Sequence, residues 1–281
     1  MGKFTGVLLA SDFDNTLVYT EEALRRGAGV PELSDENRAA LEYFMAQGGR
    51  FTVATGRALA AFINHAKHIP MNAPGIVCNG AALYDYDAEE YLETTMLDAA
   101  ARERGQQVLD AFPAVAAEAY YIDNIIYGVN PNQFTRNHER LTRVTVTEAP
   151  SLLEVPLPLG KILFEGEHED LLQVQAFFRE HGWGRDYELI FSGRTLFEMT
   201  VKGATKGDMV CRLAKRLGIS MDHVYCAGDE ANDISMLTVA ARGFAPANCV
   251  EAVRNCGATI VSHARDHAIA EVIGILDKIY S

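Results

Sequence analysis

Apolar and polar positions follow one another along the chain in blocks that predict a mixed α/β fold. Residues 7–10 (VLLA) are apolar without a polar break, which predicts a short strand buried on both faces, as in a parallel sheet covered by helices. Residues 50–54 (RFTVA), 75–78 (GIVC) and 224–227 (VYCA) predict further short strands. Strand, helix and strand follow in this order up to residue 54, which is the arrangement of a βαβ unit in a parallel sheet.

Helical spacing and helix-end residues predict the helices between these strands. Ser34 is a suitable N-cap for a helix that ends near Gln47, before a pair of glycines. Apolar residues at i, i+3, i+4 and i+7 predict an amphipathic helix that Gly218 ends: Val210, Leu213, Ala214 and Leu217. Further helices are predicted over residues 58–68, 98–112, 168–181 and 268–279 and from residue 233, and residues 18–33 form a polar connection.

The middle of the chain has a different texture, which predicts an inserted module. Short strands are predicted there over residues 119–123, 125–129, 143–148 and 160–166, and a hairpin over residues 187–201 with its turn at Ser192 and Gly193. The expected fold class is therefore α/β. A Rossmann-like parallel-sheet core, residues 1–84 and 191–281, carries an α+β insertion over residues 85–190.

Composition and charge exclude several kinds of partner. The 281 residues carry 25 basic and 38 acidic side chains, a net charge of -13, which disfavours binding to nucleic acid or to an anionic membrane. The five cysteines form no CxxC pair, so we expect buried free thiols, typical of a reducing compartment, and not a disulfide framework or a zinc site. No apolar run is long enough to span a bilayer, and the cytoplasm is the expected location.

Two carboxylates follow the first predicted strand directly. Asp12 and Asp14 are two residues apart, so in an extended segment they face the same way, at the end of a strand where open α/β sheets bind ligands. Phe13, between them, points in the opposite direction and is expected to anchor the turn in the core. We interpret Asp12 as a nucleophile and Asp14 as its proton-transfer partner, both holding a divalent cation. The alternative is an Asp-rich turn of ordinary loop chemistry.

Three further groups stand after strands or at helix starts. Thr55 and Gly56 offer a hydroxyl and free amides to a phosphate at a helix N-terminus, or simply cap that helix. Lys206 opens a helix, where its charge opposes the helix dipole, so its place suggests a role other than helix stability; a solvated lysine is the alternative. Asp229 ends a buried strand, and Asp233 can reach back to it as a cap or a metal partner.

Together these motifs resemble the haloacid dehalogenase-like phosphatases, specifically the Cof-type branch with a large α+β cap. The four motifs occur in the family's order: DFDNTL from Asp12, ATGR around Thr55, ATKG around Lys206, and GDEAND ending at Asp233. Asn79 and Gly80 in VCNGA also match this branch. The resemblance covers both core segments, and it implies that residues 85–190 form the cap domain. In that module Lys161 and Arg194 are candidate substrate contacts, with a salt-bridging role as the alternative.

The resemblance implies a mechanism and a cofactor. Asp12 would attack the phosphorus atom to form an aspartyl-phosphate, and Asp14 would protonate the leaving oxygen and then activate water. Mg²⁺ would be held by the Asp12 carboxylate, the Asp14 backbone carbonyl and Asp229, with Asp233 bonded to metal-bound waters. Thr55, Gly56 and Lys206 would bind the phosphoryl oxygens, and Asn232 would orient the site.

The function expected from this resemblance is Mg²⁺-dependent hydrolysis of small phosphate monoesters, most plausibly sugar phosphates. The protein would act on a small phosphorylated metabolite as a monomer or small homo-oligomer, with no nucleic acid or membrane partner. A phosphomutase on the same scaffold would keep the aspartyl-phosphate but return the phosphoryl group to the sugar. A third possibility is a regulatory module that binds phosphate without turnover.

Overall fold

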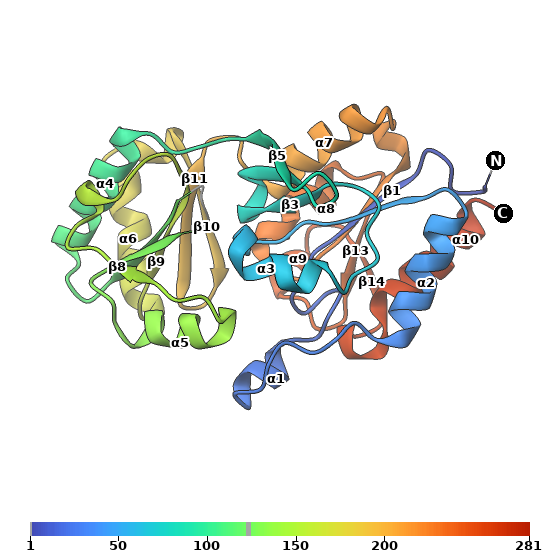
Figure 1. The fold of residues 1–281 in the computed structure, drawn as a ribbon, viewed down its shortest axis with the longest axis horizontal. Coiled ribbons are helices and arrows are strands. Elements are labelled where there is room, and N and C mark those ends of the chain that lie inside the picture. The colour runs from blue at the N-terminus through green and yellow to red at the C-terminus, as the bar shows by residue number, and fades with distance from the viewer. Residues whose placement is uncertain (1, 122–124) are drawn as a thin grey trace. The chain divides into compact units, whose positions relative to one another are not determined.

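The computed structural model describes residues 2–121 and 125–281 (Figure 1). The chain forms two compact units, which we describe separately. The first consists of Met1–Gly56, Phe62–Leu92 and Thr205–Ser281, and the second of Arg57–Ala61 and Glu93–Ala204. The division of the sequence at residues 85 and 190 into core and cap stays a prediction.

The first unit is built on a five-stranded parallel sheet in the order β14-β13-β12-β1-β2. These strands are β1 (Leu8–Ser11), β2 (Arg50–Val53), β12 (Val224–Ala227), β13 (Arg242–Pro246) and β14 (Thr259–Val261). Helices of this unit include α2 (Asp35–Ala46), α7 (Lys206–Leu217), α8 (Ile234–Val239), α9 (Glu251–Arg254) and α10 (Ala268–Ile279), and α3 (Leu59–Ala66) belongs to it from Phe62 onward. The predicted parallel-sheet core of an α/β fold is confirmed.

Side chains of the central strands alternate between two hydrophobic clusters, one on each face of the sheet. In β1, Leu9 joins the cluster under α2 and α10, whereas Leu8 and Ala10 join the cluster under α7 and α8. The helices α2 and α10 lie side by side on their face (Figure 1). All four residues of β1 are buried, so the uninterrupted apolar run is explained by burial from both sides.

Helix ends agree with the sequence signals. The Ser34 side chain accepts a hydrogen bond from the Asn37 amide and begins α2. The Thr205 side chain accepts one from the Asp208 amide and begins α7, and Gly218, with φ 68°, ends that helix in the left-handed conformation that glycine adopts without strain. Residues 18–33 are less regular, but a short helix, α1 (Glu21–Arg25), lies within this connection, and the sequence pattern did not predict it.

The third predicted strand does not belong to the parallel sheet. β3 (Gly75–Val77) pairs antiparallel with β4 (Ala82–Asp85), which continues to β5 (Glu90–Thr94) in a separate three-stranded sheet. Its link to the main sheet is a parallel bridge between Ala54 and Ile76. The strands β4 and β5 were not predicted from the sequence.

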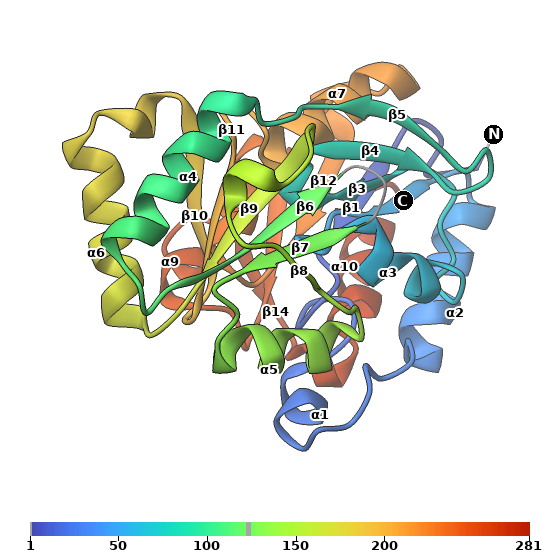
Figure 2. The same ribbon diagram turned by 60° about the vertical axis from the view of Figure 1, so that its left-hand side comes forward.

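The second unit contains a six-stranded sheet in the order β10-β11-β9-β6-β7-β8 (Figure 2). The strands are β6 (Ala116–Tyr121), β7 (Ile126–Val129), β8 (Thr147–Glu148), β9 (Leu159–Glu165), β10 (Tyr187–Gly193) and β11 (Leu196–Val201). Residues of α4 (Ala99–Ala111) and α6 (His168–Glu180) pack in one cluster with alternate residues of β6, β9 and β11. The α+β character expected of this region is confirmed.

Three details of the second unit differ from the sequence prediction. The helix α5 (Gln133–Thr142) was missed, and the strand predicted over 143–148 is reduced to β8 because Arg143 ends α5. The turn of the β10–β11 hairpin falls at Arg194 and Thr195, two residues after the predicted place. The last two residues of the strand predicted over 119–123 lie outside the described residues.

Two general expectations can be compared with the fold. Each of the five cysteines is a free thiol, as expected, and three of them are buried. Within the described part of the chain, none of the helices combines the length and the apolar character that a bilayer crossing requires.

Phe13 is the first residue that we would test, because it fixes the turn after β1. Its ring is 1% exposed and its centroid lies 5.1 Å from that of Phe62. Phe13→Ala is expected to lower the free energy of unfolding by about 3–5 kcal/mol, measured by urea unfolding followed by circular dichroism. Ile279→Ala, at a residue 45% exposed, is the control and should change it by about 0.5 kcal/mol or less. Equal effects would contradict the role of Phe13.

Candidate active site

The predicted acidic residues come together at the carboxyl ends of β1 and β12. These strands pair in parallel with Ser11 opposite Ala227, so the residues that follow them meet at the same edge of the sheet. Asp12 follows β1 directly, and its amide donates a hydrogen bond of 2.8 Å to the Ala227 carbonyl. Asp229 follows β12 after one glycine. Both side chains are buried, at 7% and 3% exposure.

The turn after Asp12 has a defined local structure. Asn15 adopts a left-handed conformation with φ 54°, which Asn tolerates better than most residues, and the Val18 amide donates to the Phe13 carbonyl at 3.0 Å. Asp14 is half-buried and bridges to Val18. Its negative charge is one of the smaller causes that raise the pKa of Asp12, after burial.

Lys206 lies between two carboxylates. Its side chain is 1% exposed, and Nζ donates to Asp12 Oδ1 at 2.7 Å and to Asp233 Oδ1 at 2.6 Å. Burial alone would lower the pKa of this lysine, but the two carboxylates outweigh it and raise the pKa above the usual range. These bonds explain why a lysine stands in the first turn of α7 against the helix dipole. The alternative of a solvated lysine is wrong.

Backbone amides and a hydroxyl orient the remaining carboxylates. Asp233 Oδ2 accepts hydrogen bonds of 2.9 Å from the amides of Asp229 and Glu230, so it caps the turn as expected. Asp229 Oδ1 accepts one of 2.7 Å from the Thr16 hydroxyl. Gly228 leaves the space for this arrangement, since a Cβ there would come within 2.4 Å of the Asp233 Cβ.

Negative charge is in excess at this site. Carboxylate oxygens of Asp12, Asp229 and Asp233 lie within 4.8 Å of one another, and Lys206 supplies one positive charge. Burial, with repulsion from Asp233 and Asp14, raises the pKa of Asp12 to about 7, and burial with Asp12 and Asp233 raises the pKa of Asp229 well above its usual range. Hard oxygen donors with an unbalanced charge fit a divalent cation such as Mg²⁺.

The Thr55–Gly56 segment differs from its prediction in one respect. The helix α3 begins at Leu59, and the Thr55 amide donates to the Ile76 carbonyl at 2.8 Å, so this amide is not a free donor at a helix N-terminus. The fully buried Thr55 follows the end of β2 beside β1. A Cβ on Gly56 would lie 3.0 Å from Asn79 Oδ1, so the segment lies against Asn79.

Asn232 connects this segment to the acidic turn. Its Nδ2 donates to Asn79 Oδ1 at 2.8 Å, and its own Oδ1 is buried with no hydrogen-bond partner among the described residues. Asn79 is itself held in a left-handed conformation, and Gly80, with φ 98°, passes so close to α7 that a Cβ would meet the Thr205 carbonyl oxygen at 2.1 Å. The Asn79 turn therefore fixes the start of the helix that carries Lys206.

Sequence reasoning missed Thr16 as a contributor to this site. It was read as one letter of the DFDNTL motif and not as a donor, although a hydroxyl two residues after the second carboxylate is a usable signal. Asn79 and Gly80 were matched to the branch without a role. The sequence feature that could have indicated a role is the position of Asn79, a polar residue between a buried strand and Gly80.

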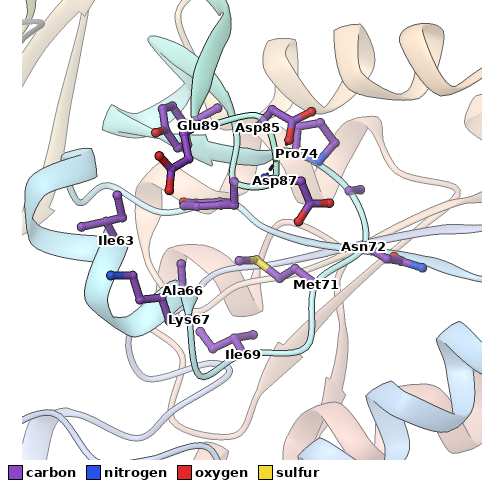
Figure 3. A pocket seen from close by; sticks show the side chains of 13 residues that line it. Ile63, Ala66, Lys67, Ile69, Met71, Asn72, Pro74, Asp85, Asp87 and Glu89 are labelled. Carbon is purple, nitrogen blue, oxygen red and sulfur yellow. Dashed lines mark hydrogen bonds between the residues drawn. The ribbon is translucent and has the colours of Figure 1, made fainter.

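A separate pocket of about 390 Å³ lies between α3 and the β4–β5 hairpin (Figure 3). Met71 and Ile69 form part of its apolar wall, with Lys67 on one side and the carboxylates of Asp85 and Glu89 on the other. None of the eight residues predicted for the active site lines it. The carboxylate cluster, and not this pocket, has the groups needed for phosphoryl chemistry.

The fold and the carboxylate–lysine cluster define the class of protein. The sequence profile of the haloacid dehalogenase-like hydrolases matches residues 9–273, and the chain belongs to this family.

Two phosphatases are similar in sequence to this protein over nearly its whole length. The pyridoxal phosphate phosphatase YbhA of Escherichia coli is 26% identical over 95% of this chain and 97% of its own. The 5-amino-6-(5-phospho-D-ribitylamino)uracil phosphatase YwtE of Bacillus subtilis is 23% identical over 94% of this chain and 96% of its own.

Solved structures of the superfamily share the fold. A subclass IIB sugar phosphatase superposes with a TM-score of 0.81 at 20% identity, covering 96% of this chain and 99% of its own. A haloacid dehalogenase-like hydrolase from Bacteroides thetaiotaomicron gives 0.80 at 21% identity, covering 96% and 99%. These findings confirm the predicted family and fold class and the expectation of a phosphatase.

Lys206 is expected to stabilise the fold as well as the site. Lys206→Met would leave the buried carboxylates of Asp12 and Asp233 without their cation, so we expect the free energy of unfolding to fall by about 3–5 kcal/mol. Urea unfolding without added divalent ions measures this. Lys202→Met is the matched control, because that side chain is 57% exposed and should contribute less than about 1 kcal/mol. A loss at Lys206 no larger than at Lys202 would contradict the electrostatic account.

Proposed function

We propose that the protein is a Mg²⁺-dependent phosphatase that hydrolyses small phosphate monoesters through a phosphoryl group carried on Asp12. The observation that carries this proposal is the buried contact of Lys206 Nζ with Asp12 Oδ1, at 2.7 Å, beside the carboxylates of Asp229 and Asp233. One oxygen of Asp12 is thereby oriented by an ammonium group, and the excess negative charge calls for a second cation. This combination suits nucleophilic attack on phosphorus.

Mg²⁺ fits the donor set by charge and by chemistry. Asp12 and Asp229 would hold the ion with carboxylate oxygens, Asp14 with its backbone carbonyl, and Asp233 through water molecules. When bound, the ion neutralises charge on the carboxylates and on the transferring phosphoryl group. The buried Asn232 Oδ1, which has no hydrogen-bond partner among the described residues, offers an acceptor for water or substrate at the same place.

The side chains of this protein divide the reaction into two displacements. In the first, an Asp12 oxygen attacks phosphorus, the bond to the leaving oxygen breaks, and Asp14 gives that oxygen its proton. In the second, Asp14 takes a proton from water, the water oxygen attacks phosphorus, and the bond to Asp12 breaks to release phosphate. Asp14 ends the cycle protonated and Asp12 ionised, as both began.

Four groups would position the phosphoryl oxygens during both steps. Lys206 would supply the positive charge, and Thr55 and Gly56 would supply a hydroxyl and a close backbone approach. Asn232 would orient the site through its hydrogen bond to Asn79. Phosphoryl transfer depends mainly on such positioning and charge neutralisation, so fixed donors matter more than additional reactive groups.

For the substrate we propose a small phosphorylated metabolite, most plausibly a sugar phosphate. The relatives described above are named for pyridoxal phosphate and for a phosphoribitylamino compound, and one structural neighbour for sugar phosphates. These names share a phosphate monoester on a small organic molecule. The cap role of residues 85–190, the cytoplasmic location, a monomer or small homo-oligomer, and the lack of nucleic-acid or membrane partners belong to the same proposal.

A phosphate-release screen tests the activity and the nucleophile together. We expect steady release from phosphorylated sugars, nucleotides and cofactors only when Mg²⁺ is present, and Asp12→Asn should lower the rate by more than about a thousandfold. Asp222→Asn, at an exposed carboxylate, is the control and should keep full activity. Activity that survives in the Asp12 variant would remove the proposed nucleophile.

A trapping experiment separates the roles of the two aspartates. With a substrate whose leaving group needs no proton, Asp14→Asn should still transfer the phosphoryl group but should hydrolyse the intermediate about 100- to 10,000-fold more slowly. Intact-protein mass spectrometry should then show one added phosphoryl group, which Asp12→Asn never acquires.

Phosphate release by the unmodified protein, followed over time, distinguishes the competing functions. In the unmodified protein, a phosphomutase would form the intermediate and return it to a sugar with little free phosphate. A regulatory module would show one Mg²⁺-dependent burst without turnover. Steady phosphate release excludes both, whereas either of the other patterns would contradict the proposed function.

A further inference from the structure

A second group of buried ionisable side chains lies in the second unit, on the face of its sheet opposite to α4 and α6. Glu118 of β6 stands between Ala117 and Ala119, and Ala117 and Ala119 belong to the hydrophobic cluster under those helices. Glu165 of β9 follows Phe164 of the same cluster. Because successive residues of a strand point to opposite faces, both glutamates point away from the cluster.

Strand register brings the two glutamates close together. β6 and β9 pair antiparallel, with Glu118 opposite Leu163 and Ala116 opposite Glu165, so the glutamates are diagonal neighbours on one face. They are 1% and 0% exposed. Two buried carboxylates on adjacent strands repel one another, and burial together with Glu118 raises the pKa of Glu165 to about 7, so a positive group or ion between them would stabilise the charged pair.

Helix α5 places a histidine against this pair. Asn132 begins the helix with a capping box, and its Nδ2 also donates to the Glu165 carbonyl at 3.3 Å, so the helix is tied to β9. His138 Nδ1 lies 2.9 Å from Glu118 Oε2 and 3.4 Å from Glu165 Oε1. The ring is 16% exposed, which leaves a route from solvent.

Two hydroxyl groups orient the carboxylates of Glu118 and Glu165 by donating hydrogen bonds to them. Tyr120 donates to Glu118 Oε2 at 2.6 Å, and Thr135 donates to Glu165 Oε2 at 2.7 Å. The other oxygen of each glutamate, Oε1, is buried and accepts no hydrogen bond among the described residues, although Glu165 Oε1 has the 3.4 Å contact with His138. Each carboxylate is thus oriented through Oε2 while its Oε1 accepts no hydrogen bond, as in metal sites whose ligands are held by outer hydrogen bonds.

Lys161 does not neutralise the charge of Glu118 and Glu165. Lys161 Nζ donates to the buried Glu198 at 2.9 Å and lies 4.5 Å from the centroid of the Tyr120 ring, so its charge is shared with a third glutamate. Although burial opposes it, the carboxylates of Glu118 and Glu165 raise the pKa of His138, so this pair favours a positive charge beside it, either a proton on the imidazole or a bound cation. A divalent cation that binds there would displace the imidazole proton and supply the positive charge itself.

We propose that Glu118, His138 and Glu165 bind a divalent transition-metal ion of the Zn²⁺ class. Their candidate ligand atoms lie within 4.8 Å of one another. Bonds of about 2.0–2.2 Å to tetrahedral zinc separate ligand atoms by roughly 3.4 Å, close to the contacts that His138 already makes. An imidazole with two carboxylates favours a transition metal over Mg²⁺, which prefers oxygen donors alone. The site belongs to the second unit and does not depend on the phosphatase proposal.

Metal titration of the full-length protein tests this site. The protein is stripped with a chelator, Mg²⁺ is kept at a saturating concentration to occupy the aspartate cluster of the first unit, and Zn²⁺ is added in a calorimeter. Co²⁺ is then used as a spectroscopic probe, because its visible bands report nitrogen and oxygen ligands. The expected result is one equivalent of Zn²⁺ bound, with Co²⁺ bands typical of mixed ligands.

Substitutions test whether the bound equivalent of Zn²⁺ lies at the proposed residues. His138→Gln should lose it, and Thr135→Val, which removes only the hydroxyl that orients Glu165, should weaken binding by roughly tenfold. His168→Gln is the matched control, because this histidine is in the same unit and bonds to the Arg194 carbonyl. It should bind as the unmodified protein does.

Two outcomes would overturn the proposal, and the first needs no variant. Unmodified protein that takes up no Zn²⁺ beyond the exchange of Mg²⁺ would show that His138 acts as a protonated partner of the glutamates. An equivalent that His138→Gln retains, in a variant with an unchanged circular dichroism spectrum, would place the metal elsewhere.

Discussion

The structure of the first unit depends on how three buried carboxylates are tolerated around one ammonium group. Lys206 contacts Asp12 and Asp233, and the amides of residues 229 and 230 and the Thr16 hydroxyl supply the remaining donors. Separate parts of the chain meet here, so the cluster requires the parallel pairing of β1 with β12 and the position of α7. The same crowding that costs stability gives the cluster a set of oxygen donors that suits a cation.

Much of this could be predicted because the signals are local. Burial on both faces leaves an uninterrupted apolar run in β1, and an N-cap, an apolar period of 3.6 and a terminal glycine define α7. The candidate residues were found because carboxylates and a lysine stand directly after strands or at a helix start. Their meeting followed from topology, since carboxyl ends of parallel strands share an edge.

What could not be predicted depends on tertiary contacts. Helix α5 has only two apolar residues in ten, too few for apolar spacing to predict it; it is held by the Asn132 cap and by Thr135 and His138 against two glutamates of separate strands. The Thr55 amide read as free because its acceptor, the Ile76 carbonyl, lies on another strand. The hydrogen bond from Thr16 to Asp229 joins residues more than two hundred positions apart, which no local pattern reveals.

Both units bury carboxylates, but the positively charged or titratable group that contacts these carboxylates differs between the units. In the first unit Lys206 lies within the cluster and contacts two of its members, so one cation is built into the chain. In the second unit Lys161 is engaged by Glu198, and a histidine, whose charge is not fixed, faces Glu118 and Glu165. Oxygen donors alone suit Mg²⁺, whereas an added imidazole favours a softer ion, so the side chains of the two clusters suit different kinds of cation.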